Sequence, residues 1–178
     1  AANDPNGATV SANLNLGGAN RTFTVNDSAA ASTDLTISGA VGATNRRLTV
    51  TGDGDTLISG NVSLGSGGIT KTGSGTLTLS GANSYTGTTN IGIAAGASGG
   101  TLVLGANNVL PNTTVNLYAG TLDINTRTDT IGALNLGGGA GGTTASVTGT
   151  TGTLTVGGNL TYSAANNANG ATISANLN

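Results

Sequence analysis

The sequence predicts an all-β fold, a parallel β-helix or β-solenoid whose rungs are short strands joined at Gly and Asn corners. Two observations lead to this prediction. Apolar and polar residues alternate with period two in many short runs, which is typical of strands with one buried face. The runs are separated by Gly and Asn, residues that tolerate the left-handed backbone of a tight corner.

The alternating runs share a common frame: polar, apolar, polar, apolar, polar, and then often Gly or Asn. Thr fills many outward positions, which suits a pleated surface. No window has helical spacing, and the runs are too short and too poor in aromatic residues for the core of a sandwich. The clearest runs span residues 22–25, 34–37, 47–50, 76–79, 101–104, 121–124 and 153–156, with sister runs at 62–64, 115–117 and 134–136.

The composition excludes several classes of function. Charged residues make up 7% of the 178 residues, and the chain lacks His, Cys, Met, Trp, Glu and Gln. Without imidazole or thiolate groups there is no usual zinc site and no usual nucleophile–base pair. The 5 Lys and Arg residues are scattered and the net charge is −2, so no basic stripe for nucleic acid is expected.

A long repeat sets the expected domain organisation. Residues 1–15 read AANDPNGATVSANLN and residues 164–178 read AANNANGATISANLN, so the segment that starts at Ala1 begins again at Ala164. We interpret residues 1–163 as one copy of a tandem β-solenoid repeat and residues 164–178 as the start of the next copy. The alternative is two similar rungs within one solenoid. At about 20 to 25 residues per rung, one copy makes roughly seven rungs and a rod of roughly 35 Å. Because the chain begins at Ala1, we expect a processed or excised piece of a longer protein.

The central stretch resembles a known family. Residues 67–79 read GGITKTGSGTLTL and residues 80–91 continue SGANSYTGTTNI. This is similar to the autotransporter-associated β-strand repeat, also called the passenger-associated transport repeat, with Ile69 in place of the usual Leu. The resemblance implies a right-handed β-helix in a large bacterial surface protein. The insert at residues 92–99 departs from the pattern and is expected to loop out of a rung.

Two residues of this stretch allow more than one interpretation. Lys71 is either part of a ligand site or a residue at a rung corner whose charge prevents adhesive contacts, and the second is favoured. Tyr85 is expected to cover a corner with its hydroxyl in water. Both expectations place the polar atoms of these side chains in solvent.

Other motifs are weak as functional sites. Asp53 and Asp55 are weak candidates for a metal site, but an Asp-Gly turn explains them better. The Gly-rich run at residues 137–142 lacks the Lys-Ser/Thr pair and the helix of a phosphate loop. Thr-x-Thr pairs at 22/24, 76/78 and 153/155 would suit an ice-binding face, but their spacing is irregular. No catalytic or cofactor-binding residue is predicted, and no cofactor is expected.

These observations predict a structural or adhesive extracellular fibre segment rather than an enzyme. Expected partners are neighbouring repeats or identical subunits end to end, with cell-surface or matrix polysaccharide as a further option. Neither nucleic acid nor a membrane span is expected, since no apolar run approaches the roughly 20 residues needed to cross a bilayer. An autotransporter passenger scaffold that displays a functional domain elsewhere is the alternative, and a polysaccharide-active or ice-binding β-helix is a minor one. The expected location is extracellular, at the bacterial cell surface.

Overall fold

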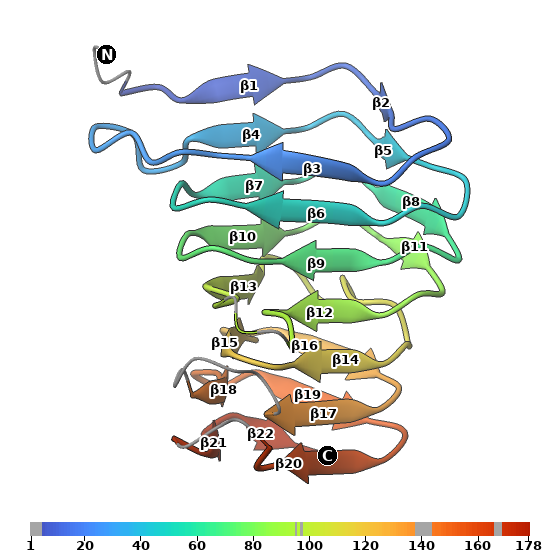
Figure 1. Cartoon of the computed structure of the whole chain (residues 1–178), viewed down its shortest axis with the longest axis vertical. Helices are drawn as coiled ribbons and strands as arrows, with labels where there is room; N and C mark the ends of the chain where they lie inside the picture. The colour runs from blue at the N-terminus through green and yellow to red at the C-terminus, as the bar shows by residue number, and fades with distance from the viewer. Residues whose placement is uncertain (1–4, 95, 97, 138–143, 166–168) are drawn as a thin grey trace.

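The chain forms a solenoid of stacked parallel strands in a computed structural model that describes residues 5–94, 96, 98–137, 144–165 and 169–178 (Figure 1). The described residues form 22 strands and no helix. Every strand pair among them is parallel. The strand order assigns successive strands of the chain to different sheets and returns to each sheet one turn later. The predicted parallel β-solenoid is therefore confirmed.

The longest sheet, sheet A, contains one strand from every turn. Its outer strands β1 and β21 are seven steps apart and carry residues 8–10 and 171–173, which are equivalent in the repeat that begins at Ala1 and again at Ala164. In order, sheet A comprises β1 (Ala8–Val10), β4 (Leu35–Ile37), β7 (Thr56–Ile58), β10 (Thr76–Leu79), β13 (Thr101–Leu104), β15 (Gly120–Asp123), β18 (Ala145–Thr148) and β21 (Ala171–Ile173).

A second long sheet, sheet C, forms another wall of the solenoid. The length of chain between its consecutive strands varies, from the short step Val115↔Leu134 to the long step Arg21↔Leu48. In order, sheet C comprises β3 (Arg21–Thr24), β6 (Leu48–Thr51), β9 (Ile69–Lys71), β12 (Thr89–Ile91), β14 (Val115–Leu117), β17 (Leu134–Gly137) and β20 (Leu160–Ser163).

The third wall is divided between two short sheets. Sheet B comprises β2 (Leu14–Asn15), β5 (Val41–Gly42), β8 (Val62–Gly65) and β11 (Ser84–Tyr85). Sheet D comprises β16 (Thr128–Ile131), β19 (Thr153–Val156) and β22 (Asn176–Leu177). The turn between them contains residues 105–114, which are described and include no strand.

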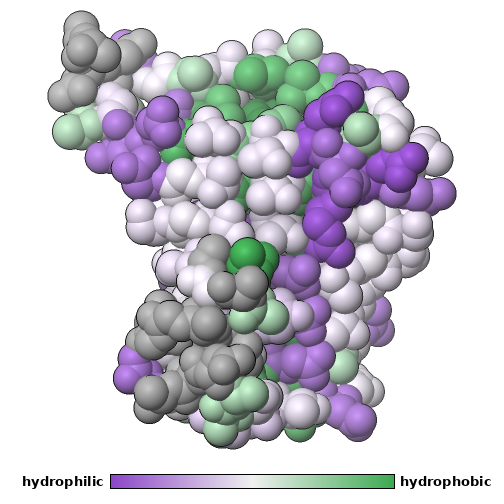
Figure 2. Space-filling view, viewed as in Figure 1, coloured by the Kyte–Doolittle hydropathy of each residue, from purple (hydrophilic) through white to green (hydrophobic). Residues whose placement is uncertain are grey.

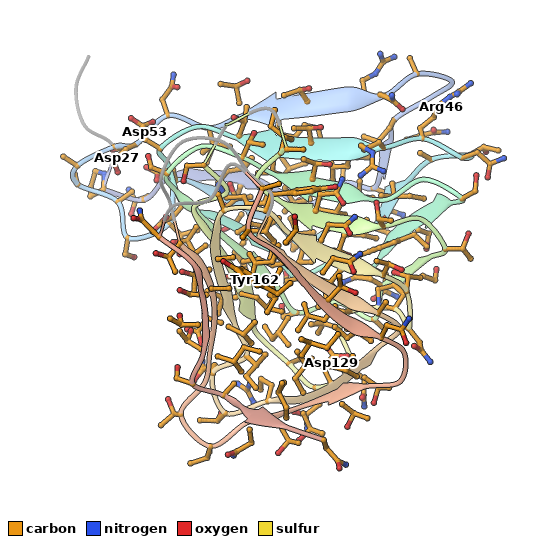
Figure 3. The ribbon with its side chains drawn as sticks, turned by 60° about the horizontal axis from the view of Figure 1, so that its bottom comes forward. Asp27, Arg46, Asp53, Asp129 and Tyr162 are labelled. Carbon is orange, nitrogen blue, oxygen red and sulfur yellow. The ribbon has the colours of Figure 1, made fainter. Side chains whose placement is uncertain are left out.

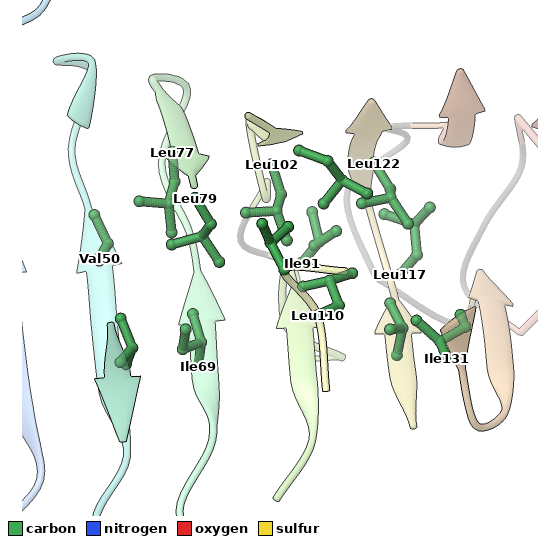
Figure 4. Packing of buried hydrophobic residues seen from close by; sticks show 14 of the residues in the cluster. Val50, Ile69, Leu77, Leu79, Ile91, Leu102, Leu110, Leu117, Leu122 and Ile131 are labelled. Carbon is green, nitrogen blue, oxygen red and sulfur yellow. The ribbon is translucent and has the colours of Figure 1, made fainter. Parts of the chain in front are cut away.

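The core consists of aliphatic columns inside the stacked turns (Figure 4). One column of sheet A runs Ile37, Ile58, Leu79 and Leu104, each of which is at most 1% exposed. The alternating burial of strands such as β6, β10 and β13 confirms the predicted period-two pattern. Positive φ angles at Asn45 and Asn125 and at many Gly residues confirm the predicted corner chemistry. Among the described residues, no helix is long and apolar enough to cross a lipid bilayer.

Candidate functional site

The first polar group of interest is Lys71, which ends β9. Lys71 faces the inside of sheet C, between Val50 and Ile91 in the register, and is 1% exposed. Its Nζ donates hydrogen bonds to the carbonyl oxygens of Thr72 at 2.7 Å and Gly73 at 3.2 Å. The expectation that its charge projects into solvent is wrong, because the period-two pattern turns the side chain inward.

Burial changes the protonation of this amine. Desolvation lowers the pKa of Lys71 from 10.5 to about 8, and the nearby Asp55 carboxylate opposes that shift. A buried ammonium loses hydration, which favours the neutral form. The two carbonyl contacts satisfy two of its three N–H donors. The geometry therefore explains Lys71 as a structural group that closes a corner.

The Asp residues next to this corner hold successive turns together. Asp34 accepts hydrogen bonds through Oδ1 from the Ser28 amide and through Oδ2 from the Asp55 amide, both at 2.7 Å. Asp55 Oδ1 accepts from the Thr76 amide one turn further on, also at 2.7 Å. Asp34 and Asp55 thus occupy equivalent positions in consecutive turns, and each carboxylate satisfies a backbone amide of the next turn.

Asp53, the other weak metal candidate, lies at the same edge and is labelled with Asp27 in Figure 3. Its Oδ1 accepts a hydrogen bond from the Asp27 amide at 3.1 Å. Within the described ranges, no group of three or more His, Cys, Asp or Glu side chains is placed to hold a metal ion. One carboxylate oxygen of each of Asp53 and Asp55 accepts a backbone hydrogen bond, which gives both residues a structural explanation.

Tyr85 also lies inside the solenoid. It is 3% exposed, and its hydroxyl is 2.7 Å from Thr89 Oγ1. Burial raises the pKa of Tyr85, and its hydrogen bond with Thr89 partly opposes that shift. The expectation that the Tyr85 hydroxyl lies in water is wrong. The ring, carried by β11, is buried in the core of the solenoid, and Thr89 supplies a hydrogen-bond partner for the hydroxyl.

Asp129, in β16, is a buried carboxylate that sequence reasoning missed. It is 1% exposed, and its Oδ2 accepts hydrogen bonds from the amides of Val109 at 2.9 Å and Leu110 at 3.0 Å. Its Oδ1 accepts from the Thr130 amide at 2.7 Å. Desolvation raises the pKa of Asp129, opposed by these three hydrogen bonds. Asp129 thus satisfies two backbone amides of residues 105–114, the segment without a strand that lies between sheets B and D.

The outer faces carry hydroxyl and amide ladders. On sheet C, Asn116 Nδ2 donates to Asn90 Oδ1 at 2.9 Å, and Asn135 Nδ2 donates to Asn116 Oδ1 at 2.8 Å. Arg47 reaches across two later turns, with Nη1 donating to Thr70 Oγ1 at 2.9 Å and Nη2 to Thr88 Oγ1 at 3.3 Å. These side chains therefore reinforce the stacking of turns from outside.

The three Thr-x-Thr pairs do not share a face. They lie in strands of three different sheets: β3 of sheet C, β10 of sheet A and β19 of sheet D. An ice-binding surface requires such pairs to be aligned, so this alternative gains no support from the fold. The other motif discounted above, the Gly-rich run at residues 137–142, lies outside the described residues except for Gly137, which ends β17.

The C-terminal end of the solenoid leaves apolar side chains uncovered. Tyr162 is 49% exposed and Leu160 is 48% exposed on β20, with Ile173 and Leu177 also exposed on the last strands. At the opposite end, Figure 2 shows hydrophobic residues gathered at the top of the view. Both ends also present strand edges, since β1, β3, β20 and β21 are outer strands of their sheets.

Comparison with known families accounts for the middle of the chain. A family model, the passenger-associated-transport-repeat, matches residues 69–96. Residues 69–96 therefore resemble this repeat. This repeat includes β9 to β12, and because β9 and β12 pair in sheet C, it makes one full turn of the solenoid. No curated protein and no solved structure matches the chain.

In sheet A, the step that contains the end of the repeat is longer than the step before it. The step along the chain from Thr56 to its partner Leu77 is shorter than the step from Thr76 to its partner Thr101. The additional residues fall between β12 and β13, where residues 95 and 97 lie outside the described part. The described residues of the predicted insert at 92–99 thus belong to a connection between strands, and β10 and β13 still pair in register. The repeat family implies a bacterial surface or secreted protein.

Proposed function

We propose that this chain is a segment of an extracellular structural fibre, which extends by tandem repetition of the unit formed by residues 1–163. The observation that supports the proposal best is the open C-terminal end, where Leu160 and Tyr162 are each about half exposed. Apolar residues this exposed at the end of a continuous core favour a further layer. Residues 164–178, which repeat residues 1–15, begin such a layer.

Stacking also provides the means of extension. Each turn donates and accepts backbone hydrogen bonds with the turns before and after it, so an uncovered final turn is an open sheet edge. A following copy satisfies this edge with the same ladders that join turns within the unit. The fibre needs few charged residues, in agreement with a charged content of 7%.

Electron microscopy of chains with one, two and four copies tests the proposal. One copy adds seven strand steps in sheet A, and at about 4.8 Å per step the rod should lengthen by about 34 Å per copy. The single chain supplies the reference length. Particles that grow as separate beads, or whose length does not increase regularly with copy number, would contradict the fibre.

A passenger scaffold is the second candidate, and the match to the passenger-associated-transport-repeat favours it. In that case the solenoid holds a functional domain away from the cell, and adhesion belongs to the distant domain. Binding assays of this chain and of its full-length parent protein distinguish the two. Adhesion by the parent alone supports the scaffold, whereas adhesion by this chain supports an adhesive fibre.

A further inference from the structure

One inward column of sheet C begins and ends with an aromatic residue. Phe23 pairs with Val50 at the N-terminal end, and Leu136 pairs with Tyr162 at the C-terminal end. The registers between them connect the whole column. The column runs Phe23, Val50, Lys71, Ile91, Leu117, Leu136 and Tyr162. Two of the four aromatic residues of the chain therefore mark the two ends of one column.

We propose that Tyr162 of one copy stacks on Phe23 of the next copy, so that an aromatic pair joins consecutive units of the fibre. This inference rests on the proposed tandem stacking and adds the register of the junction. The open C-terminal end of one copy then contacts β3 of the next copy. Residues 164–178, which already repeat residues 1–15, lead the chain toward that segment.

The geometry of the two ends supports this contact. Tyr162 is 49% exposed, and its ring lies beside Gly137, where an added Cβ would be 3.2 Å from Cε2. Figure 3, turned to bring the bottom of Figure 1 forward, shows Tyr162 in the middle of that end. Phe23 is half-buried and packs against the other end of the core. Each aromatic side chain has a core neighbour on one side along its column.

The chain length between the two residues also fits. In a tandem chain, residue 163 and the equivalents of residues 1–22 separate Tyr162 from the next Phe23. This segment is longer than residues 72–90, which connect Lys71 with Ile91, and shorter than residues 24–49, which connect Phe23 with Val50. One turn of ordinary length therefore takes the chain from Tyr162 to the next Phe23.

A register shifted by two positions is the main competitor. In sheet A the successive pairings connect Ala8 with Ile173, although Ala171 is its equivalent in the repeat. The same shift in sheet C would place Val25 of the next copy on Tyr162. The unshifted register is favoured because β22 continues sheet D with Leu177 on Leu154, and Leu177 is equivalent to Leu14. In the unshifted register Arg21 of the next copy lies on Leu160, and the step from Leu177 to that Arg21 is one residue longer than the step from Leu154 to Leu160. The shifted register makes this step three residues longer. Aromatic pairs on neighbouring strands also stabilise a sheet.

Disulfide trapping in a tandem chain tests the register. The chain is residues 1–178 followed by residues 16–178, and it contains no natural Cys. The test variant combines Tyr162→Cys in the first copy with Phe23→Cys in the second. The matched control keeps Tyr162→Cys and combines it with Val25→Cys in the second copy. Directly paired strands lie about 4.8 Å apart, within the Cα separation of about 4.4–6.8 Å that a disulfide spans.

We expect the Tyr162–Phe23 variant to form the disulfide on mild oxidation, detected by mass spectrometry of proteolytic fragments, and the Val25 variant to remain reduced. Preferential crosslinking of the Val25 variant would overturn the proposed register while leaving the stacking of copies intact. If neither variant crosslinks although both keep the circular dichroism of the parent chain, the register and the stacking of copies are both contradicted.

A thermal measurement provides an independent readout without cysteine. Phe23→Leu is introduced either in the first copy, where Phe23 lies at the free end, or in the second copy, where it lies at the junction. We expect the second-copy substitution to lower the unfolding midpoint more than the first-copy substitution, because only the junction residue loses an aromatic partner. Equal shifts in the two variants would contradict the aromatic pair.

Discussion

Individual polar residues occupy inward positions that aliphatic residues hold elsewhere in the columns. Lys71 and Asp129 are each 1% exposed, and each has hydrogen bonds to backbone groups. Thr56 shows the opposite case, since its buried Oγ1 has no hydrogen-bond partner. A buried polar group is costly only when it lacks partners. Lys71 and Asp129 therefore tie irregular backbone to the core, although desolvation penalises their charged forms.

The lowered pKa of Lys71 predicts a pH dependence of stability. The folded chain loses this proton near pH 8, whereas the unfolded chain keeps it to about pH 10.5. Because the unfolded state then binds more protons, the free energy of unfolding should rise with pH above about 8. The rise for one proton is at most about 1.4 kcal/mol per pH unit. We expect Lys71→Met to lack this contribution.

Chemical unfolding of both proteins between pH 7.5 and about 9 measures the difference, in a range where tyrosines of the unfolded chain stay mostly protonated. Lys71→Arg is the control, since its guanidinium stays charged over the whole range. The assignment of Lys71 is contradicted if the parent chain and Lys71→Met have the same dependence on pH.

The burial of Lys71 and Asp129 could be predicted in part from the sequence. The runs Ile69-Thr70-Lys71 and Asp129-Thr130-Ile131 both place the charged residue two positions from a buried Ile, so period two alone turns it inward. The ordinary preference of Lys for solvent argued against that position. The backbone partners could not be predicted, because they come from corners and from a turn without a strand, whose conformations depend on neighbouring turns.

At the scale of elements, the strands are very short, from the two residues of β2 to the four of β6, so the corners determine how accurately they stack. Gly73 shows how closely the corners approach one another. Its φ is +77°, and an added Cβ would lie 2.3 Å from the carbonyl oxygen of Gly52 in the preceding turn. A side chain at this position therefore has neither a favourable backbone conformation nor space.

We expect Gly73→Ala to destabilise the fold. The left-handed backbone alone costs about 1–2 kcal/mol for a residue with a Cβ, and the contact with Gly52 adds to that cost. Gly18→Ala is the matched control, because no atom lies within 4 Å of its added Cβ, and its effect should stay within about 0.5 kcal/mol. Denaturant unfolding compares the two variants. Equal stabilities would show that corner spacing does not limit the stacking.

The whole molecule is a stack of turns, and each of its two ends presents outer strands of the sheets. Its strand content, period-two burial and corner residues followed from the sequence. The number of residues between stacked strands did not follow from the sequence, because the corners that connect the strands differ in length. The unequal steps Val115↔Leu134 and Arg21↔Leu48 of sheet C show this difference. Only the pairing of turns establishes which side chains share a column, and this pairing locates Phe23 and Tyr162 at opposite ends.

Fibre diffraction from an oriented tandem array tests most directly whether the turns stack along the fibre axis. We predict a reflection at about 4.8 Å on the meridian, from parallel strands perpendicular to the axis. We also predict an axial repeat of about 34 Å, from seven steps per copy at that spacing. The same strand reflection on the equator, or an array with no axial order at either spacing, would contradict the stacked solenoid.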